Sequence, residues 1–437
     1  MPHSSILLTS MRSPYLDSDR VYPPLGILYL KAFLNRHGVR VGLEDEFDFT
    51  SPEKYAEFDS FGASVMTPQR EASLEFLHFC KKHYAKKPVI IGGPHAKHYI
   101  EEVKNEAWDY IIPHDGQRAL LTVLQGTAPR VVYDFIQKKE WENIDAPDRR
   151  SPEAIALLQK YNYTLDGRRS TTMLTALGCP ERCKFCEDAQ TAVRWSSIDN
   201  IRMQLDDIQA LGYQGVYIFD DLFAVALKMI KPICAELSKR DIIYRCNGQA
   251  RYFNDEFARV LADSGCKEIA FGAETGSQKI LDGIEKRTTI EQNYKFVELC
   301  KKYGIVCKAF LMLGLPGETY ETIAETEAFI KDAAPDDFQL SIYYPYKGTK
   351  LRDAIDSKVD DFDLQFEGEG LGAYGQKGGS TESVVRTQAL SAEDLLRERD
   401  RLVRAYRPGS HANKWETVAG TDHFFDTHLK SKAEYGD

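Results

Sequence analysis

Apolar and polar residues alternate along the first third of the chain in short blocks that predict strands and helices in turn. Strand-like apolar runs occur at 5–9, 39–43, 61–65, 88–91 and 109–112. Helical spacing of apolar residues separates them at 25–36 and 69–84. Strands and helices that alternate at this spacing predict an α/β, Rossmann-like doubly wound domain, in which ligands bind at the carboxyl ends of parallel strands.

A second alternating series begins near residue 170. Its strand-like runs lie at 171–177, 215–219, 242–246, 268–272, 306–313 and 338–343, and a helical stretch separates each from the next. A complete parallel barrel needs eight strand-helix units, so six of them predict a partial TIM-type barrel.

Composition changes mark the boundaries between these parts. The stretch 135–168 is charged and interrupted by proline, and 367–380 is rich in glycine, as expected of a flexible loop that could act as a lid. A charged helix is expected near 391–404. We therefore expect a Rossmann-like domain at 1–134, a linker at 135–168, a partial barrel at 169–355 and a small C-terminal extension at 356–437 that covers the barrel mouth.

Charge and hydropathy narrow the function classes. The formal net charge is −10, and the sequence contains no block of lysine or arginine that could bind a phosphate backbone. Both features argue against nucleic acid as a partner. No apolar run approaches the roughly 20 residues that span a bilayer, and the N-terminus does not resemble a signal peptide. Nine cysteines without a secretory signal indicate reduced thiols and a cytoplasmic, oxygen-sensitive protein.

Three of the cysteines form a CxxxCxxC loop directly after the first barrel strand: Cys179, Cys183 and Cys186. Three thiolates on one loop can ligate three irons of a 4Fe-4S cluster and leave the fourth iron open to a small molecule with an amine and a carboxylate. A structural zinc site would need a fourth ligand, and no histidine occurs between Tyr133 and Ser410. The other six cysteines lack paired spacing and are interpreted as packed apolar residues.

From about 170 to 355 the chain resembles the radical S-adenosylmethionine (SAM) superfamily. The resemblance lies in the cysteine loop and in the sequences that close the later strands, namely 219–221, 247–251, 271–277, 309–319 and 344–349. It implies that SAM is held by Phe185, Asp220, Asp221, Arg251, Glu274, Ser277, Met312 and Gly314. Each of these residues also has a plain structural alternative as a turn, a helix start or a packed side chain.

The first domain resembles the cobalamin-binding domain of cobalamin-dependent radical SAM enzymes. The similar stretches are 22–30, 90–95 and 114–117, and they imply cobalamin contacts from Tyr22, Leu25, Gly26, Gly92, Gly93, His95, Asp115 and Gly116. The Asp-x-His-x-x-Gly motif that supplies a cobalt ligand elsewhere is absent, so no lower axial ligand is assigned, and Gln117 stands where relatives often have glutamate. A surface or capping role for His95, and a domain that only packs on the barrel, remain the alternatives.

The resemblance implies a cobalamin-dependent methyltransferase that acts on an unactivated carbon of a small molecule or peptide. Its cofactors would be a 4Fe-4S cluster, SAM and cobalamin, with an external electron donor such as flavodoxin or ferredoxin. The alternative is a radical SAM cyclase, dehydratase or rearrangement enzyme that does not methylate. A non-catalytic binding module is a third class, and the intact cysteine loop argues against it.

Overall fold

The computed structural model describes residues 3–12, 20–357, 364–366, 368 and 382–406, which form two compact units. Beyond residue 20, the first unit runs to Asn162 and also takes in Asp199–Ile208, whereas the second holds Tyr163–Ile198 and the described residues from Gln209 onward. The chain thus changes unit at Asn162, between the expected boundaries at 134 and 168. The division into a linker and a C-terminal extension stays a prediction.

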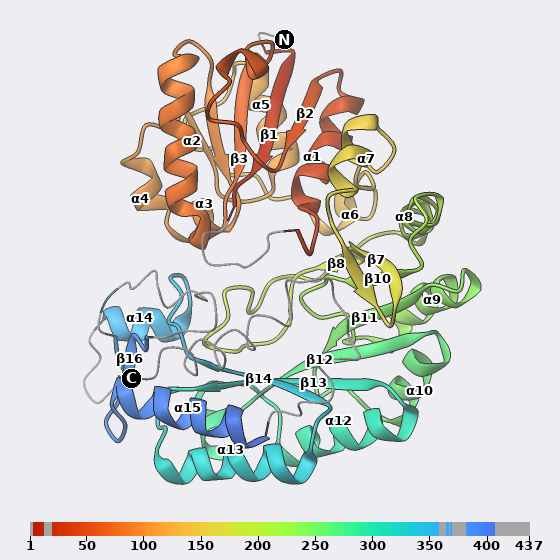
Figure 1. The fold of residues 1–437 in the computed structure, drawn as a ribbon, viewed down its shortest axis with the longest axis vertical. Helices are drawn as coiled ribbons and strands as arrows, with labels where there is room; N and C mark the ends of the chain where they lie inside the picture. Colours follow the sequence, from red (N-terminus) through yellow and green to blue (C-terminus); the bar gives the residue numbers. More distant parts are fainter. Residues whose placement is uncertain (1–2, 13–19, 358–363, 367, 369–381, 407–437) are drawn as a thin grey trace, which may run out of the picture. The chain divides into compact units, whose positions relative to one another are not determined.

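The first unit contains a parallel sheet of five strands (Figure 1). The strands are β1 (Ser5–Ser10), β2 (Arg40–Glu44), β3 (Ser60–Ser64), β4 (Val89–Gly92) and β5 (Tyr110–Ile112). Their order is β2-β1-β3-β4-β5, and all neighbours are parallel. This confirms the Rossmann-like fold, and the order reverses between β1 and β3, where such sheets open a ligand crevice.

Helices cover both faces of this sheet because its strands are apolar on both faces. They are α1 (Leu25–Arg36), α2 (Arg70–His83), α3 (Pro94–His98), α4 (Ile100–Lys104), α5 (Gly116–Leu124), α6 (Lys138–Trp141) and α7 (Pro152–Leu158), with short 3-10 turns at Pro52–Tyr55 and Thr67–Gln69. Leu7 and Phe61 pack in one core with Phe76 of α2. Helices α6 and α7 lie within the expected linker, and α7 packs against β2.

The helix that follows the cysteine loop in sequence, α8 (Ile198–Ala210), packs with the first unit. The Asn200 side-chain amide donates to the Ile144 carbonyl at 2.7 Å, and Arg150 pairs with Asp207 at 2.6 Å. Asn200 is 2% exposed, so its hydrogen bond is a buried one. The first unit therefore includes a stretch of sequence that lies beyond the cysteine loop.

The second unit is a curled half-barrel, which confirms the predicted partial barrel. Its strands are β6 (Tyr163–Leu165), β7 (Arg168–Met173), β10 (Gly215–Ile218), β11 (Ile243–Gly248), β12 (Cys266–Glu274), β13 (Val306–Leu313) and β14 (Asp337–Ile342). They follow the order β14-β13-β12-β11-β10-β7-β6, parallel except for β6 with β7. The first parallel strand ends at Met173, not at Leu177 as predicted.

Helices pack on the outer face of the half-barrel (Figure 1). They are α9 (Leu227–Lys239), α10 (Asp255–Asp263), α12 (Ile290–Tyr303) and α13 (Tyr320–Ala333). The shorter helices α11 (Gln278–Gly283) and α14 (Lys350–Asp356) follow β12 and β14 in sequence. The hydroxyls of Thr289 and Thr319 accept from the third backbone amide beyond them, which caps α12 and α13, and Gly304 ends α12 with a φ of 66°. Along β13, Leu311 and Leu313 are buried, while Met312 is half-buried on the opposite, concave face.

The described part of the C-terminal extension lies beside β14 and α13. It contains β15 (Leu364–Phe366), which pairs antiparallel with β16 (Val385–Thr387), and α15 (Ala392–Tyr406). Leu395 and Leu402 are completely buried, and Arg401 makes a two-pronged bond to Glu327 at 2.7 and 3.0 Å. The glycine-rich stretch lies outside the described residues except for Gly368. Among the helices that can be described, none is long and apolar enough to cross a membrane.

Candidate functional site

The cysteine loop begins at a short hairpin after the first barrel strand. Strand β8 (Ala176–Leu177) pairs antiparallel with β9 (Arg194–Trp195), and the loop lies between them. Gly178 has a φ of 96°, and a Cβ there would lie 2.4 Å from the Ala192 carbonyl oxygen, so only glycine fits. The Cys179 amide donates to the Thr191 hydroxyl at 2.8 Å, and the Thr191 amide returns a bond to the Cys179 carbonyl at 3.0 Å. The backbone thus fixes both ends of the loop.

The three thiols are sheltered from water to different degrees. Cys183 is buried, and Cys179 and Cys186 are half-buried. Burial raises the pKa of all three thiols. With a smaller contribution from the neighbouring thiols, the pKa reaches about 11 for Cys179 and about 12 for Cys186. Since a metal binds the thiolate, coordination would have to displace these protons.

The three cysteines fit an iron-sulfur cluster by the chemistry of their sulfur atoms. The positions of their side chains support it less. Three soft sulfur ligands on one short loop match the ligand preference of such clusters. Within the described ranges, however, no group of three or more His, Cys, Asp or Glu side chains is arranged so that it could hold a metal ion. The ligand roles of Cys179, Cys183 and Cys186 therefore stay a prediction.

Glu181, which lies inside the cysteine loop, ties the loop to the end of β11. Its carboxylate is 3% exposed and accepts from the Tyr252 hydroxyl, and the Arg251 guanidinium lies 3.6 Å away. Burial, followed by the hydrogen bond to Glu181, raises the pKa of Tyr252 to about 12. Arg251, expected near the SAM carboxylate, is thus engaged with the loop itself.

The two aspartates that follow β10 also hold the loop. Asp220 is 1% exposed, and its carboxylate accepts from the Thr175 amide at 2.7 Å and from the Thr175 hydroxyl. Burial raises the pKa of Asp220 to about 7. Asp221 is exposed and accepts from the Gly178 amide at 2.7 Å. Both carboxylates therefore position the start of the loop, and the SAM contacts expected of them stay a prediction.

Glu274, at the end of β12, forms a buried ion pair that the sequence did not reveal. The Lys286 ammonium lies 2.5 Å from the Glu274 carboxylate, and both residues are 6% exposed. The same ammonium lies 5.8 Å from the centre of the Phe185 ring, which belongs to the cysteine loop. Phe185 and Glu274, two of the predicted SAM contacts, are thus brought together around Lys286.

The remaining predicted SAM contacts lie at the ends of β12 and β13. Ser277 is 1% exposed at the start of α11, and its amide donates to the Thr275 hydroxyl at 3.1 Å. Gly314 has a φ of 88°, and its amide donates to the Glu318 carboxylate at 2.7 Å. The left-handed backbone favours glycine there, and a Cβ would also come within 3.0 Å of the Val385 side chain.

In the first unit, the predicted cobalamin contacts gather at the carboxyl edge of the sheet and at the starts of α1 and α5. Gly93 has a φ of 92°, and a Cβ there would lie 2.8 Å from the Val65 backbone. Gly26 faces open space, whereas Gly116 packs against Leu30. Asp115 accepts from the Ile136 amide at 2.8 Å, which secures the segment after β5.

His95 does not lie on the surface, so the surface role considered for it is wrong. Its side chain is 1% exposed at the start of α3, and its ring stacks on Tyr99 at 5.1 Å. Tyr22 is half-buried and Leu25 is buried at the start of α1. None of these positions tests cobalamin binding, which stays a prediction for each of them.

Three large apolar residues at the same edge were missed from the sequence. Met66 follows β3 and is 48% exposed, and Tyr133 and Phe135 follow the segment that bridges to β5 and are 63% and 44% exposed. The carboxyl edge of a doubly wound sheet is where its ligands bind. Exposed apolar side chains there suit a large, partly apolar ligand, and knowledge of the strand order would have been needed to find them.

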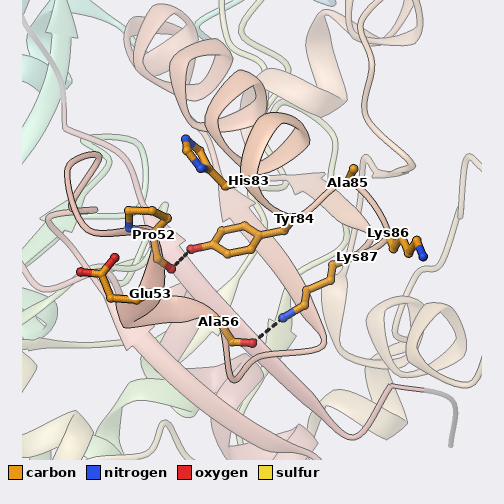
Figure 2. A pocket seen from close by; sticks show the side chains of 8 residues that line it. All are labelled: Pro52, Glu53, Ala56, His83, Tyr84, Ala85, Lys86 and Lys87. Atoms are coloured by element: carbon orange, nitrogen blue, oxygen red, sulfur yellow. Dashed lines mark hydrogen bonds between the residues drawn. The ribbon is translucent and has the colours of Figure 1, made fainter.

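A hollow of about 530 Å³ lies elsewhere in the first unit, and Figure 2 shows the side chains that line it. It is lined by Pro52, Glu53, Ala56, His83, Tyr84, Ala85, Lys86 and Lys87. The Tyr84 hydroxyl donates to the Pro52 carbonyl across it. The hollow lies where α2 ends and before β4 begins, which is the amino end of that strand and not the predicted cofactor edge.

Comparison with known proteins agrees with this geometry. Residues 173–330 match the radical SAM superfamily. The chain is 25% identical over 356 residues to an uncharacterized methyltransferase of Pyrococcus horikoshii, covering 75% of this chain and 77% of that protein. It is 26% identical over 426 residues to the anaerobic magnesium-protoporphyrin IX monomethyl ester cyclase of Rubrivivax gelatinosus. This match covers 88% of this chain and 73% of the cyclase.

The fold is shared with the radical SAM methyltransferase TsrM of Kitasatospora setae. The TM-score is 0.72 at 17% identity to the structure with cobalamin and a [4Fe-4S] cluster bound, with 84% of this chain and 78% of that chain covered. A second structure of TsrM, with tryptophan and a SAM analogue bound, gives a TM-score of 0.70 at 18% identity, covering 83% and 78%. Residues 173–330, which form most of the half-barrel and include the cysteine loop, thus match the radical SAM superfamily.

Proposed function

We propose that the chain binds a 4Fe-4S cluster through Cys179, Cys183 and Cys186 and uses it to cleave SAM reductively. The observation that carries the proposal is the loop itself. Its three thiols are sheltered, and its Cys179 and Gly178 amides donate hydrogen bonds to Thr191 and Asp221, which fixes its backbone. When bound, the cluster supplies an electron and SAM supplies a radical that abstracts hydrogen.

The residues of the half-barrel orient SAM and exclude water in this proposal. Phe185 offers an aromatic surface for the adenine, Met312 faces the concave side of the sheet, and Gly314 keeps the end of β13 clear of a side chain. Ser277 and Glu274 supply polar groups at the end of β12. Asp220, Asp221 and Arg251 act through the loop, because their side chains bond to it or to Thr175.

We propose cobalamin as the second cofactor and methyl transfer to carbon as the reaction. Exposed Met66, Tyr133 and Phe135, together with the open position beside Gly26, fit a bulky ligand at the carboxyl edge of the first unit. The methyltransferase relative and the cobalamin-bound TsrM structure support the same assignment. Because TsrM was also solved with tryptophan, a small molecule is the substrate class we favour, with a peptide as an alternative.

A second candidate function is a radical cyclization without methyl transfer. The cyclase relative covers 88% of the chain, which is more than the methyltransferase relative covers. In either case the cluster needs a one-electron donor, and we propose a small flavodoxin or ferredoxin. All nine cysteines are free, which supports a reducing, cytoplasmic location.

Anaerobic reconstitution with iron, sulfide and hydroxocobalamin tests the proposal. We expect iron-sulfur absorption, bound cobalamin, and deoxyadenosine together with S-adenosylhomocysteine when SAM and a reductant are added. Deoxyadenosine without bound cobalamin would favour the cyclase function. Cys183→Ala should abolish deoxyadenosine formation, whereas the control Cys80→Ala, at a buried thiol in the core of the first unit, should retain it. Normal deoxyadenosine formation by Cys183→Ala would refute cluster ligation by this loop.

A further inference from the structure

The ion pair between Lys286 and Glu274 is more deeply buried than a lysine and a glutamate normally are. Each residue is 6% exposed, and the charged atoms lie 2.5 Å apart. Lysine and glutamate are among the residues least often buried in proteins. This pair therefore needs a physical explanation.

The backbone around the pair is specially shaped to hold it. Glu274 has a φ of 64°, and both neighbours of Lys286 are also left-handed, Glu285 at 53° and Arg287 at 59°. The register of β12 against β13 shifts between Gly272 and Glu274. At Gly272 a Cβ would lie 2.0 Å from the Glu274 carboxylate and 2.6 Å from the Lys286 ammonium, so the absence of a side chain there makes room for both charges.

Stability alone does not account for this arrangement. A buried ion pair loses the hydration of both charges, and well-packed apolar residues in its place are often neutral or stabilising. Each non-glycine residue in the left-handed region adds a cost on the order of 1 kcal/mol or more. Strained backbone that holds a buried charge is typical of functional sites.

The position of Lys286 indicates which group the charge serves. Its ammonium lies 5.8 Å from the centre of the Phe185 ring. Phe185 belongs to the cysteine loop and lies between Cys183 and Cys186 in sequence. The adjoining residues are tied to the same loop, because the Lys184 amide donates to the Ile284 carbonyl at 2.9 Å. Burial by itself would lower the pKa of Lys286, but the adjacent Glu274 carboxylate outweighs it and raises the pKa, so the side chain stays cationic.

We propose that Lys286 is a positioning residue that sets the reduction potential of the cluster, with Glu274 limiting its effect. The inference rests on the proposed ligation of a 4Fe-4S cluster by the cysteine loop. A cluster that accepts one electron becomes more negative, and a fixed cation nearby favours that reduced form. In a site shielded from water the interaction is much stronger than at the surface. Glu274 holds the ammonium in place and cancels part of its field.

The test is a redox titration of the reconstituted cluster with dithionite, followed by electron paramagnetic resonance and without SAM. Lys286→Met should shift the midpoint potential to more negative values, and Glu274→Gln should shift it to more positive values. Lys286→Arg should restore the wild-type potential. The midpoint potential of the double variant Lys286→Met, Glu274→Gln should lie between the potentials of the two single variants. None of these readings depends on turnover.

The matched control is Lys308→Met. Lys308 pairs with Asp337 at 2.9 Å across β13 and β14, near the amino ends of both strands and away from the cysteine loop. Its variant should leave the midpoint potential unchanged. Thermal unfolding of each cluster-free protein separates a fold defect from an electrostatic effect, and Glu274→Gln keeps the test available if Lys286→Met does not fold.

The outcomes distinguish this inference from the proposed function. If the wild-type protein forms no cluster through the three cysteines, the proposed function fails and the inference fails with it. If the cluster forms and Lys286→Met and Glu274→Gln both titrate like Lys308→Met, only the inference is wrong. Opposite shifts in these two variants, with recovery in Lys286→Arg, would support it.

Discussion

Glu318 is a carboxylic acid with no exposed surface, held by backbone amides at the end of β13. It accepts from Gly314 at 2.7 Å and from Leu315 at 3.3 Å, and its carbonyl accepts from the Thr387 hydroxyl at 3.0 Å. Burial raises the pKa of Glu318 from 4.5 to about 7. A single residue therefore links the predicted SAM-binding turn, the start of α13 and the C-terminal extension.

This burial predicts a pH dependence of stability. In the unfolded chain Glu318 loses its proton near pH 4.5, whereas the folded chain keeps it to about 7. Between these values the folded state binds more protons, so the free energy of unfolding falls as pH rises. Glu318→Gln should lack this fall, which amounts to about 3 kcal/mol at most. Denaturant unfolding of the cluster-free protein across that range measures it.

Glu321→Gln is the matched control because Glu321 is exposed in the first turn of α13. Hydrogen bonds from Thr319 and the backbone lower the pKa of Glu321, so its effect on stability has the opposite sign. The free energy of unfolding of the wild type and of Glu318→Gln could instead depend on pH in the same way. Folding would then not raise the pKa of Glu318, and the side chain would be ionized in the folded protein. The raised pKa of Asp220 also makes stability depend on pH. Because Asp220 is present in both the wild type and Glu318→Gln, its contribution cancels when the two are compared.

Residues were predictable from the sequence where their chemistry lies in local spacing. The cysteine loop and the glycine at 178 belong to one short segment, so their pattern could be read directly. Lys286 was missed because its role depends on contacts with Glu274 and Phe185, which only the folded chain brings together. For the same reason, the burial of His95 and the engagement of Arg251 with Glu181 could not be anticipated.

Among the elements, α15 shows how the C-terminal extension is attached. Leu395 is fully buried, and its side chain would lie 3.1 Å from a Cβ at Gly314. The extension therefore packs against the end of a barrel strand through apolar side chains, with ion pairs such as Arg401 to Glu327 outside them.

Leu395→Ala should destabilise the protein by about 2–5 kcal/mol, because it removes a buried side chain and leaves a cavity. Arg397→Ala, at an exposed residue on the same helix, should change stability by less than about 0.5 kcal/mol. Denaturant unfolding measures both. Equal effects of the two substitutions would mean that α15 is not packed as described.

Element boundaries were harder to predict than element types. The apolar run at 171–177 was read as one strand, yet β7 ends at Met173 and residues 176–177 pair with β9 in a separate hairpin. A continuous apolar run does not show where its hydrogen-bonding partner changes. Similarly, the charged stretch 135–168 contains α6 and α7, because a short helix needs only one small apolar face and a partner to cover it.

At the scale of the whole molecule, α8 predicts an unusual pattern of hydrogen exchange. Because it packs with the first unit, amides within 201–208 should exchange with the same opening free energy as β1 and β3, not as β10 and β11. Native-state exchange in increasing denaturant, read by mass spectrometry, measures this. Coupling of α8 to β10 would contradict the assignment of the helix to the first unit.

Asn200→Ala tests the packing of α8 directly, because it removes the buried hydrogen bond from the Asn200 side chain to the Ile144 carbonyl. It should speed exchange in α8 and in the segment around Ile144 together. Arg202→Ala is the control, because Arg202 lies on the exposed side of the helix and its ion pair with Asp199 is local. The architecture of both sheets could be predicted from strand-helix alternation. The return of α8 to the first unit could not, because α8 lies between the barrel strands β7 and β10 in sequence.

The return of α8 to the first unit limits how such proteins can exchange parts during evolution or design. Beyond residue 20 the described chain changes unit after Asn162, after Ile198 and after Ile208. A recombination point in the 135–168 stretch would join a first unit from one parent with an α8 from another and leave mismatched packing. A chimera that keeps both units whole must therefore take residues 199–208 from the parent that supplies the first unit, and Tyr163–Ile198, with the cysteine loop, from the parent that supplies the half-barrel.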